Sequence, residues 1–488
     1  MHAPEGSFSR HRPTQSVVAV LICLVPVLAY LRTRTWISDD LAQPVALTTW
    51  RPFGGSHFTV AADTFWLKWP FMVVMNQLGF SRLAVAGLVA IFLLIMGLAY
   101  LAIVALAGRR TSPFAAWASL LWLWSLPPFF IYAITDTAGR NLEITLGVLA
   151  AYGLGAAIAR SSWVGVVAMS LATAAMLVHD PFSVLYLVVS MLLVWRRSWR
   201  GFVWLTGCIV ASGGVAIGLR RTLHWSGVII GERPFALTPS RQFGARFREI
   251  GRWIWSFAGF RDGRLPAWPG RLTQVTSVIV ALLVVAVLVE VAWRRRGRQL
   301  PAIGVALILA TMAAFVLYRG ASGSARYLTP VFVGIALILA SATNKWLRIL
   351  VIVTGLLSAV TPLATWNDRP VGNAFERDLQ RVIEQRNLTV GYGDYWHAQV
   401  VTYFSSTRVR ALSVTCHGHE FARDVTFADD RQFERAADRM FFVFRPTTMG
   451  TCTLDDVRSQ FGGATDVVPV SDDAIVLVFA HDISGNLR

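Results

Sequence analysis

Residues 83–107 read LAVAGLVAIFLLIMGLAYLAIVALA, a continuous apolar stretch of 25 residues. About 20 such residues in a helix cross the hydrocarbon core of a bilayer, so this stretch predicts a membrane-spanning helix. Other apolar runs lie on both sides of it, and 55% of the 488 residues in the chain are hydrophobic. Soluble domains rarely reach that balance. The sequence therefore predicts an integral membrane protein.

Ten further apolar runs have the character of helices that cross or enter a membrane. They cover residues 17–31, 114–134, 142–158, 163–178, 182–195, 202–219, 275–293, 302–318, 327–343 and 347–364. Together with 83–107 they predict a polytopic α-helical membrane protein of about eleven transmembrane helices, formed by residues 1–365. The first run follows Arg10 and Arg12 as in a signal peptide, but no convincing small-residue cleavage site follows it, so we expect an uncleaved helix.

The formal charge of the chain is +17, but its basic residues do not form a nucleic-acid footprint. Most arginines stand in short clusters between apolar runs, which is how a membrane protein fixes its orientation. With a cytoplasmic N-terminus, the clusters on the inner side are Arg109–Arg110, Arg160, Arg196–Arg197–Arg200, Arg294–Arg295–Arg296–Arg298 and Lys345–Arg348. Arg220–Arg221, which opens a long loop, disagrees with this orientation, and Arg32 and Arg34 disagree more weakly. An odd number of helices then places residues 366–488 outside the cytoplasm of a cell membrane (inner or plasma membrane).

Two connections on the predicted outer side are too long to be turns, at residues 38–82 and 220–274. The first contains an apolar stretch at 64–78 that is interrupted by a lysine and a proline, which suits a helix lying in the membrane interface. The second contains the sequence RFREIGR at 246–252 with tryptophans directly after it, again typical of an interface. Long connections of this kind are usually functional or disordered, and their aromatic content argues against disorder.

Residues 366–488 alternate helix and strand patterns, which predicts a small extracytoplasmic α/β domain. The strand patterns fall at 388–392, 409–414, 440–444, 466–470 and 474–479, and the helix patterns at 373–386, 395–405, 431–439 and 454–461. This part of the sequence contains no Gly-rich phosphate loop and no nucleophile elbow. Its two cysteines, Cys416 and Cys452, could form a disulfide in an oxidising compartment, and two free thiols are an alternative of equal weight.

Charged and polar residues gather at the predicted outer ends of the spanning helices. They are Asp39 and Asp40 after the first helix, Arg140, Asn141 and Glu143 between the third and fourth, His179 and Asp180 between the fifth and sixth, and Arg326 and Tyr327 at the start of the tenth. Because each lies at a helix end, a bundle could gather them at one boundary between membrane and water. The arrangement is more informative than any single residue in it.

Each of these residues also has a purely structural interpretation. Ser38-Asp39-Asp40 could cap a helix, because carboxylates accept hydrogen bonds from the free N–H groups of a first turn, and we weight this equally with catalysis. His179-Asp180-Pro181 fits a helix break with proline opening the next helix, an interpretation that we favour slightly. A lone arginine such as Arg140 or Arg326 is more often an interface residue. Glu143 would be costly in lipid, so we expect it to face the protein interior or water.

The same residues could share one chemical task. A carboxylate at the outer face can take a proton from an acceptor hydroxyl. Nearby arginines can bind a lipid phosphate bidentately and stabilise it as it leaves. Asp39 and Asp40, together with His179 or Asp180, could instead hold a divalent metal ion such as Mg²⁺ or Mn²⁺.

This pattern resembles the GT-C glycosyltransferases, which use polyprenyl-phosphate sugars. Members of that family have many helices, an acidic residue or pair just after the first, interface helices in a long first outer loop, and often a soluble extracytoplasmic C-terminal domain. The similar features of this chain are Ser38-Asp39-Asp40, segment 41–82 and residues 366–488. Further similar patterns are Gly139-Arg140-Asn141-Leu142-Glu143, His179-Asp180-Pro181, Ala325-Arg326-Tyr327-Leu328-Thr329-Pro330 and Gly391-Tyr-Gly-Asp-Tyr-Trp396.

The resemblance implies an enzyme of the cell envelope that transfers a sugar with inversion. Asp39 or Asp40 would be the catalytic base, and Arg140 or Arg326 would contact the lipid phosphate. Asn141, Glu143 and Tyr327 lie beside these arginines in the sequence and would complete the substrate site. The implied partners are a polyprenyl-phosphate sugar donor, the lipid bilayer, and an envelope glycan, lipid or protein as acceptor.

Three other functions fit parts of the same sequence. A transporter or flippase would often show internal repeats and discontinuous helices, whereas no clear repeat is visible and few ionisable residues fall in the middle of a span. A non-enzymatic envelope assembly factor could use residues 366–488 as its binding module. A glycan ligase or polymerase with a lipid-diphosphate donor is close to the main hypothesis, and the sequence does not separate the two.

Overall fold

The structure is a computed structural model. In it the chain forms two compact units. The structure describes residues 13–33, 58–61, 82–107, 111–126, 140–179, 181–194, 199–225, 228–231, 236–260, 267–294, 299–319, 325–364, 373–424, 433 and 437–487. The first unit comprises Met1–Thr33, Val89–Gly218 and Arg233–Arg369. The second comprises Arg34–Leu88, Leu219–Glu232 and Pro370–Arg488.

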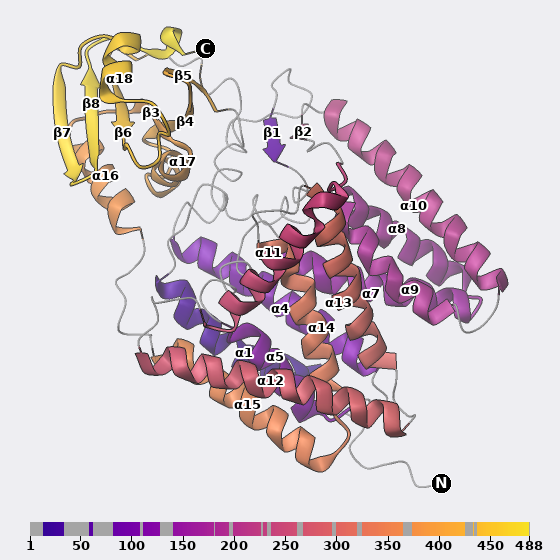
Figure 1. The fold of residues 1–488 in the computed structure, drawn as a ribbon. Coiled ribbons are helices and arrows are strands. Elements are labelled where there is room, and N and C mark those ends of the chain that lie inside the picture. The colour runs from indigo at the N-terminus through magenta and orange to yellow at the C-terminus, as the bar shows by residue number, and fades with distance from the viewer. Residues whose placement is uncertain are drawn as a thin grey trace. The chain divides into compact units, whose positions relative to one another are not determined.

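The first unit is built from apolar helices, and a helix occupies at least part of each of the eleven predicted runs (Figure 1). These elements are α1 (Pro13–Thr33), α4 (Arg82–Ala107), α5 (Pro113–Trp124), α7 (Arg140–Ala159), α8 (Trp163–His179), the 3-10 helix η2 (Pro181–Tyr186), α9 (Leu187–Val194), α10 (Trp199–Trp225), α12 (Ala267–Arg294), α13 (Gln299–Leu317), η5 (Ala325–Leu328), α14 (Thr329–Ala340) and α15 (Lys345–Ala364). Helices are the expected form because they satisfy every interior backbone polar group without water.

Five of the described helices are long and apolar enough to cross a membrane. They are Val89–Ala107, Trp199–Thr222, Gly270–Arg294, Gln299–Leu317 and Lys345–Ala364. Others are shorter: α5 and α14 have 12 residues each, and α9 has eight. The chain is therefore mostly helical, with several apolar helices that suggest a membrane protein. The count of about eleven spans is not confirmed by these lengths.

The helices of the first unit approach one another closely through small residues. A Cβ atom on Gly304 of α13 would lie 2.5 Å from the carbonyl oxygen of Gly334 on α14, and one on Gly334 would lie 2.6 Å from that of Gly304. A Cβ atom on Gly355 of α15 would likewise meet the carbonyl oxygen of Ala118 on α5 at 2.5 Å. Contacts of backbone on backbone at small residues are typical of helices that associate in lipid, where apolar side chains gain little by leaving the solvent.

One acidic residue within a predicted span has a structural role. Glu290 of α12 is 8% exposed, and its carboxylate accepts hydrogen bonds from the backbone N–H and the hydroxyl of Thr343, at 3.3 and 2.5 Å. The Nε of Arg294 lies 3.4 Å from the same carboxylate. A carboxylate in a membrane segment is tolerated where it is paired. Glu290 therefore joins the end of α12 to the turn between α14 and α15.

We expect Glu290→Ala to lower the stability of the purified protein by about 1–3 kcal/mol, because Thr343 loses its acceptor and Arg294 its partner. The midpoint of thermal unfolding in detergent measures this loss. Glu290→Gln keeps an acceptor oxygen and serves as the matched control, so it should stay much closer to the unsubstituted protein. Equal midpoints for Glu290→Ala and the unsubstituted protein would show that Glu290 does not stabilise the link between α12 and the turn between α14 and α15.

The second unit begins with two strands from segments that lie far apart in the sequence. β1 (Phe58–Ala61) pairs in parallel with β2 (Val228–Gly231), with Phe58 opposite Val228. These strands belong to the connections predicted at 38–82 and 220–274, so the structure joins two segments that the sequence assigns to the same side of the membrane. The interface helix predicted at 64–78 lies outside the described residues.

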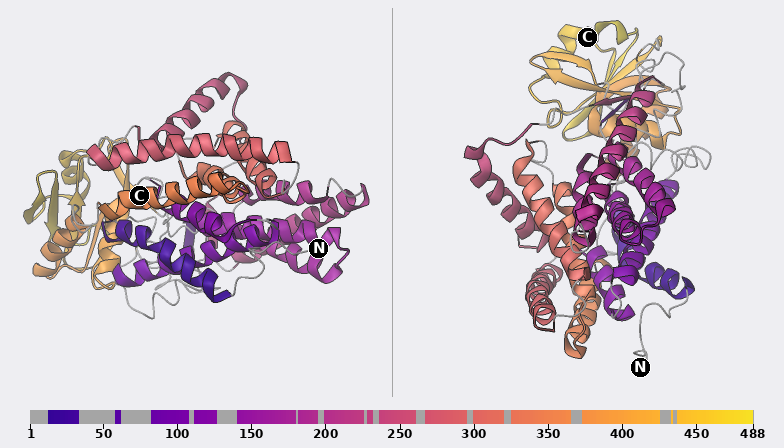
Figure 2. Two further views of the ribbon diagram at one scale, coloured as in Figure 1. Left: turned by 90° about the horizontal axis from the view of Figure 1, so that it is seen from below. Right: turned by 90° about the vertical axis from the view of Figure 1, so that its right-hand side faces the viewer.

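The described residues between 373 and 487 form a mixed sheet with helices on both faces, and Figure 2 gives two further views of it. The strand order is β5-β4-β3-β6-β8-β7. The elements are α16 (Ala374–Gln385), β3 (Val390–Asp394), α17 (Tyr395–Phe404), β4 (Arg410–His417), β5 (Glu420–Arg423), β6 (Met440–Phe444), α18 (Leu454–Phe461), β7 (Asp466–Ser471) and β8 (Ala474–Phe479). The predicted α/β character of this part of the chain is confirmed.

The sheet alternates its side chains between two buried cores. Tyr392, Leu412 and Phe442 face the core that includes residues of α18, whereas Ala411 and Phe441 face the core that includes residues of α16 and α17. This alternation is the period of two that a strand imposes. The helix predicted at 431–439 is wrong for residues 437–439, which are irregular and lead into β6. The prediction also missed β5.

Gly391 is required where β3 and β6 lie side by side. A Cβ atom there would overlap the carbonyl oxygen and the ring of Phe441 on β6. We expect Gly391→Ala to destabilise this part of the chain by about 1–3 kcal/mol, as overpacking does in other cores. Hydrogen exchange of the backbone amides in β3 and β6 of the full chain measures this effect. Gly485→Ala, which has open space around it, is the control, and equal protection in the two variants would contradict the close approach.

Candidate functional site

The second and third groups of predicted site residues, around Arg140 and His179, lie at one end of a helical hairpin. α7 begins at Arg140 and carries Asn141 and Glu143 in its first turn. α8 packs against α7 after a connection of residues 160–162, and it ends at His179. Since neighbouring helices joined by a short turn run in opposite directions, the start of α7 and the end of α8 lie at the same end of the pair. Arg140, Asn141 and His179 therefore stand at helix ends, as predicted, and their roles stay predictions.

The fourth group lies in the connection of another helical hairpin, between α13 and α14. Arg326 and Tyr327 lie in η5, between the end of α13 and the start of α14, and the side chain of Tyr327 is half-buried. α13 contacts both η5 and η2, the short helix that begins directly after Asp180. α7 also contacts α14. One helix thus connects the segment that carries Arg326 with the segment that follows His179.

The structure does not describe the acidic residues at the centre of the prediction. Asp39, Asp40 and Asp180 lie outside the described residues. The side chains of Arg140, Asn141, Glu143, His179 and Arg326 also lie outside what the structure describes, although their backbone does not. Among the described residues no group of three or more His, Cys, Asp or Glu side chains is placed to hold a metal ion. The side chains of the predicted metal ligands, His179 and Asp180, lie outside the described part of the chain.

An amphipathic helix lies beside the C-terminal end of α13. α11 (Phe243–Phe257) contacts α13, and its buried Arg246 donates from Nη2 to the backbone carbonyl of Arg319 at 3.1 Å. Arg246 also pairs with Glu249 at 3.1 Å. On a neighbouring stripe of the helix, the side chains of Phe247 and Ile254 are exposed. The interface-like sequence at 246–252 therefore lies in a helix, and the exposed apolar stripe of this helix fits one lying in a membrane interface.

The second unit contains a polar cluster that the sequence did not reveal. Asp394 ends β3 and caps α17, accepting a hydrogen bond from the backbone N–H of Trp396 at 2.9 Å. The Nδ1 atom of His397 lies 2.8 Å from the same carboxylate, and its Nε2 atom lies 3.0 Å from Nη1 of Arg445. A guanidinium can only donate, so Nε2 is the acceptor. His397 is therefore a neutral imidazole whose Nδ1–H donates to Asp394.

Arg445 links this pair to the turn between β7 and β8. Its Nε donates to Asp473 at 2.8 Å, and its guanidinium lies over the ring of Phe375, 4.9 Å from the centroid. The hydrogen bond from Arg445, followed by that from Ser471, holds the pKa of Asp473 below its usual value. A lowered pKa means that the ion pair is present above the ordinary aspartate pKa and is lost as pH falls through the lowered value.

Two sequence signals mark this cluster in retrospect. Asp394 follows a buried strand pattern within Gly391-Tyr-Gly-Asp-Tyr-Trp396, and Arg445 directly follows the strand Met440–Phe444. Polar residues at the ends of neighbouring parallel strands lie at the same edge of a sheet. The missing information was that β3 pairs with β6, because nothing local in the sequence specifies that neighbour.

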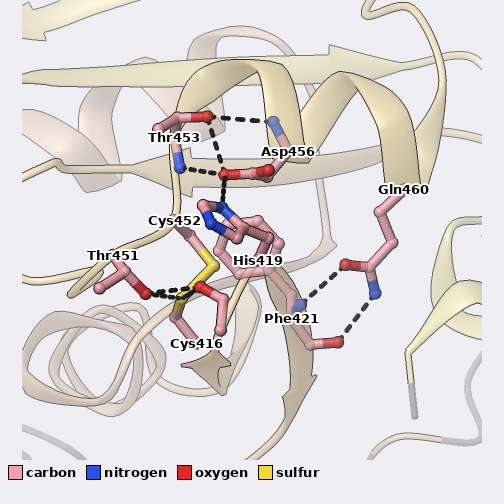
Figure 3. The surroundings of a disulfide bond; sticks show 9 residues. Cys416, His419, Phe421, Thr451, Cys452, Thr453, Asp456 and Gln460 are labelled. Carbon is pink, nitrogen blue, oxygen red and sulfur yellow. Dashed lines mark hydrogen bonds and ion pairs between the residues drawn. A yellow bond between two sulfur atoms is a disulfide. The ribbon is translucent and has the colours of Figure 1, made fainter.

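Cys416 at the end of β4 and Cys452 ahead of α18 form a disulfide, with Cα atoms 5.9 Å apart (Figure 3). Around it, Thr453 and Asp456 cap α18 reciprocally, with the Asp456 carboxylate accepting from the Thr453 N–H at 2.6 Å. Gln460 of α18 exchanges two hydrogen bonds with the backbone of Phe421 on β5, at 2.7 and 2.8 Å. The disulfide thus closes a junction at which α18 is attached to the edge of the sheet.

No protein-family model matches this chain, and no curated protein matches it. Its function is therefore inferred from its own residues and their placement.

Proposed function

We propose that this chain is an integral membrane glycosyltransferase of the cell envelope. It transfers a sugar from a polyprenyl-phosphate donor to an envelope glycan, lipid or protein, with inversion at the anomeric carbon. The observation that supports this proposal is that several segments carrying charged residues stand at the ends of packed apolar helices. The start of α7 and the end of α8 share one end of a hairpin, and α13 joins η5 to the segment after His179.

The chemistry of these helix ends suits a sugar transfer from a lipid phosphate. The acceptor oxygen forms a bond to the anomeric carbon while the bond from that carbon to the phosphate oxygen breaks. Asp39 or Asp40 takes the proton of the acceptor hydroxyl. The phosphate leaves with the bonding electrons, and Arg140 or Arg326 stabilises its added charge. Asn141, Glu143 and Tyr327 lie in the same helix ends and would orient the two substrates.

The proposed site could also bind a divalent cation. Mg²⁺ or Mn²⁺ prefers oxygen ligands, which Asp39, Asp40 and Asp180 supply, and Mn²⁺ also accepts an imidazole such as that of His179. A bound cation would neutralise part of the phosphate charge. The residues themselves would position the acceptor hydroxyl and receive its proton.

Features on both units support an extracytoplasmic site in a multi-pass cell-membrane protein. The α11 helix presents an apolar stripe of the kind that lies in a membrane interface. The disulfide between Cys416 and Cys452 favours an oxidising compartment for residues 373–487. With the positive-inside arrangement of the arginines, the N-terminus is cytoplasmic and the C-terminal domain is on the outer side.

The transfer reaction can be tested with the purified protein in liposomes. The probes are polyprenyl-phosphate hexoses and an extract of envelope glycans, and free polyprenyl phosphate is the product to quantify. We expect its release to require both the protein and the acceptor extract. Movement of the lipid-linked sugar across the bilayer of sealed vesicles, without any covalent product, would replace the proposal with a transport function.

A further inference from the structure

The polar cluster of the second unit lies at the carboxyl ends of β3 and β6, two neighbouring parallel strands. β3 pairs in parallel with β4 on one side and with β6 on the other. The chain leaves β3 through α17 to β4, and later returns to the other side of β3 as β6. The strand order therefore reverses between β3 and β6. In open α/β sheets, ligands bind outside the carboxyl ends of the strands at such a reversal.

The residues at this reversal form a set of acceptors and donors. Asp394 ends β3 and His397 lies three residues further on, Arg445 follows β6, and Glu376 lies in the first turn of α16. The side chain of Glu376 is 4% exposed and comes within 3.8 Å of His397 Nε2. It makes no hydrogen bond to any residue that the structure describes. A buried carboxylate of this kind is satisfied by a group that donates a hydrogen bond to it.

The charge of the cluster restricts what can bind. Glu376, Asp394 and Asp473 are three carboxylates, whereas Arg445 is the one cation among these cluster residues because His397 is neutral. Such a set repels phosphates and other anions. It suits a neutral ligand with several hydroxyl groups, which donate to carboxylates and accept from a guanidinium. Next to His397, the side chain of Trp396 is 45% exposed and could cover an apolar face of the ligand.

We propose that the carboxyl edge of β3 and β6 is a binding site for a neutral carbohydrate. Hydroxyl groups of the sugar donate to Glu376 and Asp473 and accept from Arg445, and a sugar face lies on Trp396. Asp394 and His397 are positioning residues, because they hold Arg445 and the start of α17 in place. If the proposed transferase function holds, this site binds the glycan acceptor, since its charge excludes the phosphate of the donor.

Binding can be measured with the full-length protein in nanodiscs. The probes are neutral trisaccharides of hexose and of N-acetylhexosamine, with a uronic-acid trisaccharide and inorganic phosphate as anionic probes, and calorimetry gives the affinity. We expect a neutral trisaccharide to bind and the anionic probes not to bind. Trp396→Ala and Asp473→Asn should each weaken binding about tenfold. Asp455→Asn, at a carboxylate of α18 whose side chain is 89% exposed, is the charge-matched control and should bind like the unsubstituted protein.

Several outcomes would overturn this site. They are binding of none of the neutral probes, preference for the anionic probes, or equal affinity in the Asp473→Asn, Trp396→Ala and Asp455→Asn proteins. The thermal unfolding midpoint of each variant shows whether a loss of binding results from unfolding. The side chain of Asp473 is partly exposed, so we expect the Asp473→Asn protein to fold. The release of polyprenyl phosphate is measured separately. Transfer without site-dependent sugar binding removes this inference alone, whereas sugar binding without transfer removes the transferase proposal alone.

Discussion

Replacement of both Asp39 and Asp40 by asparagine is expected to abolish sugar transfer and to leave the amount of protein in the membrane unchanged. Asparagine caps a helix about as well as aspartate does, so the structural role that these residues could have is retained. Asparagine cannot take a proton, and loss of a general base typically slows a reaction by about a hundredfold or more. The rate of polyprenyl-phosphate release in liposomes measures the effect.

Single substitutions then separate the two candidates for the base. Loss of activity in one of Asp39→Asn and Asp40→Asn, with activity retained in the other, identifies the residue. Asp63→Asn, in the same predicted outer segment, is the control and should transfer at the unsubstituted rate. Full activity in the double variant would exclude both residues as the base and leave them as caps.

The second large effect concerns the disulfide. Changing Cys416 and Cys452 to serine should destabilise the sheet domain by about 2–4 kcal/mol, because the bond closes a loop with a sequence separation of 36 residues and restricts the unfolded chain. The loss should be greatest around β4, β5 and α18, the elements that meet at the bond (Figure 3). Hydrogen exchange in the full-length protein, read peptide by peptide, measures it.

Cys208→Ala is the matched control, because it removes a buried cysteine of the bundle that is not in a disulfide. It should leave exchange in the sheet domain unchanged. In protein isolated from its own membrane, Cys416 and Cys452 should react with a maleimide only after reduction and unfolding. Reaction without reduction would mean that these cysteines are thiols in the cell, and it would remove the support that they give to an extracytoplasmic location.

The helices and most of the sheet domain follow from local sequence patterns. Long apolar runs specify helices wherever they occur in a membrane protein, and the strand patterns at 440–444 and 474–479 coincide with β6 and β8. β5 was missed because Glu420–Arg423 is a short edge strand with few apolar residues. Its pairing with β4 and the hydrogen bonds of its backbone to Gln460 define it, and neither is a local property.

The candidate sites show the same division between local and distant information. The placement of Arg140, His179 and Tyr327 at helix ends follows from where apolar runs begin and stop. The cluster of Asp394, His397 and Arg445 could not be predicted, because it depends on which strands become neighbours. The sequence also left open whether Cys416 and Cys452 form a disulfide or stay free thiols. Their separation in the sequence does not determine the distance between their sulfur atoms in the fold.

The most direct test of the transferase proposal is mass spectrometry of envelope glycans and lipid-linked sugars. It compares a strain that lacks the gene with its parent, and with the same strain carrying either the unsubstituted gene or the double variant Asp39→Asn and Asp40→Asn. We predict that the deletion strain accumulates one polyprenyl-phosphate sugar and loses one glycan modification. The unsubstituted gene should reverse both changes, and the double variant should reverse neither. Unchanged glycans and no build-up of a lipid-linked sugar, under conditions in which the parent makes the protein, would contradict the proposal.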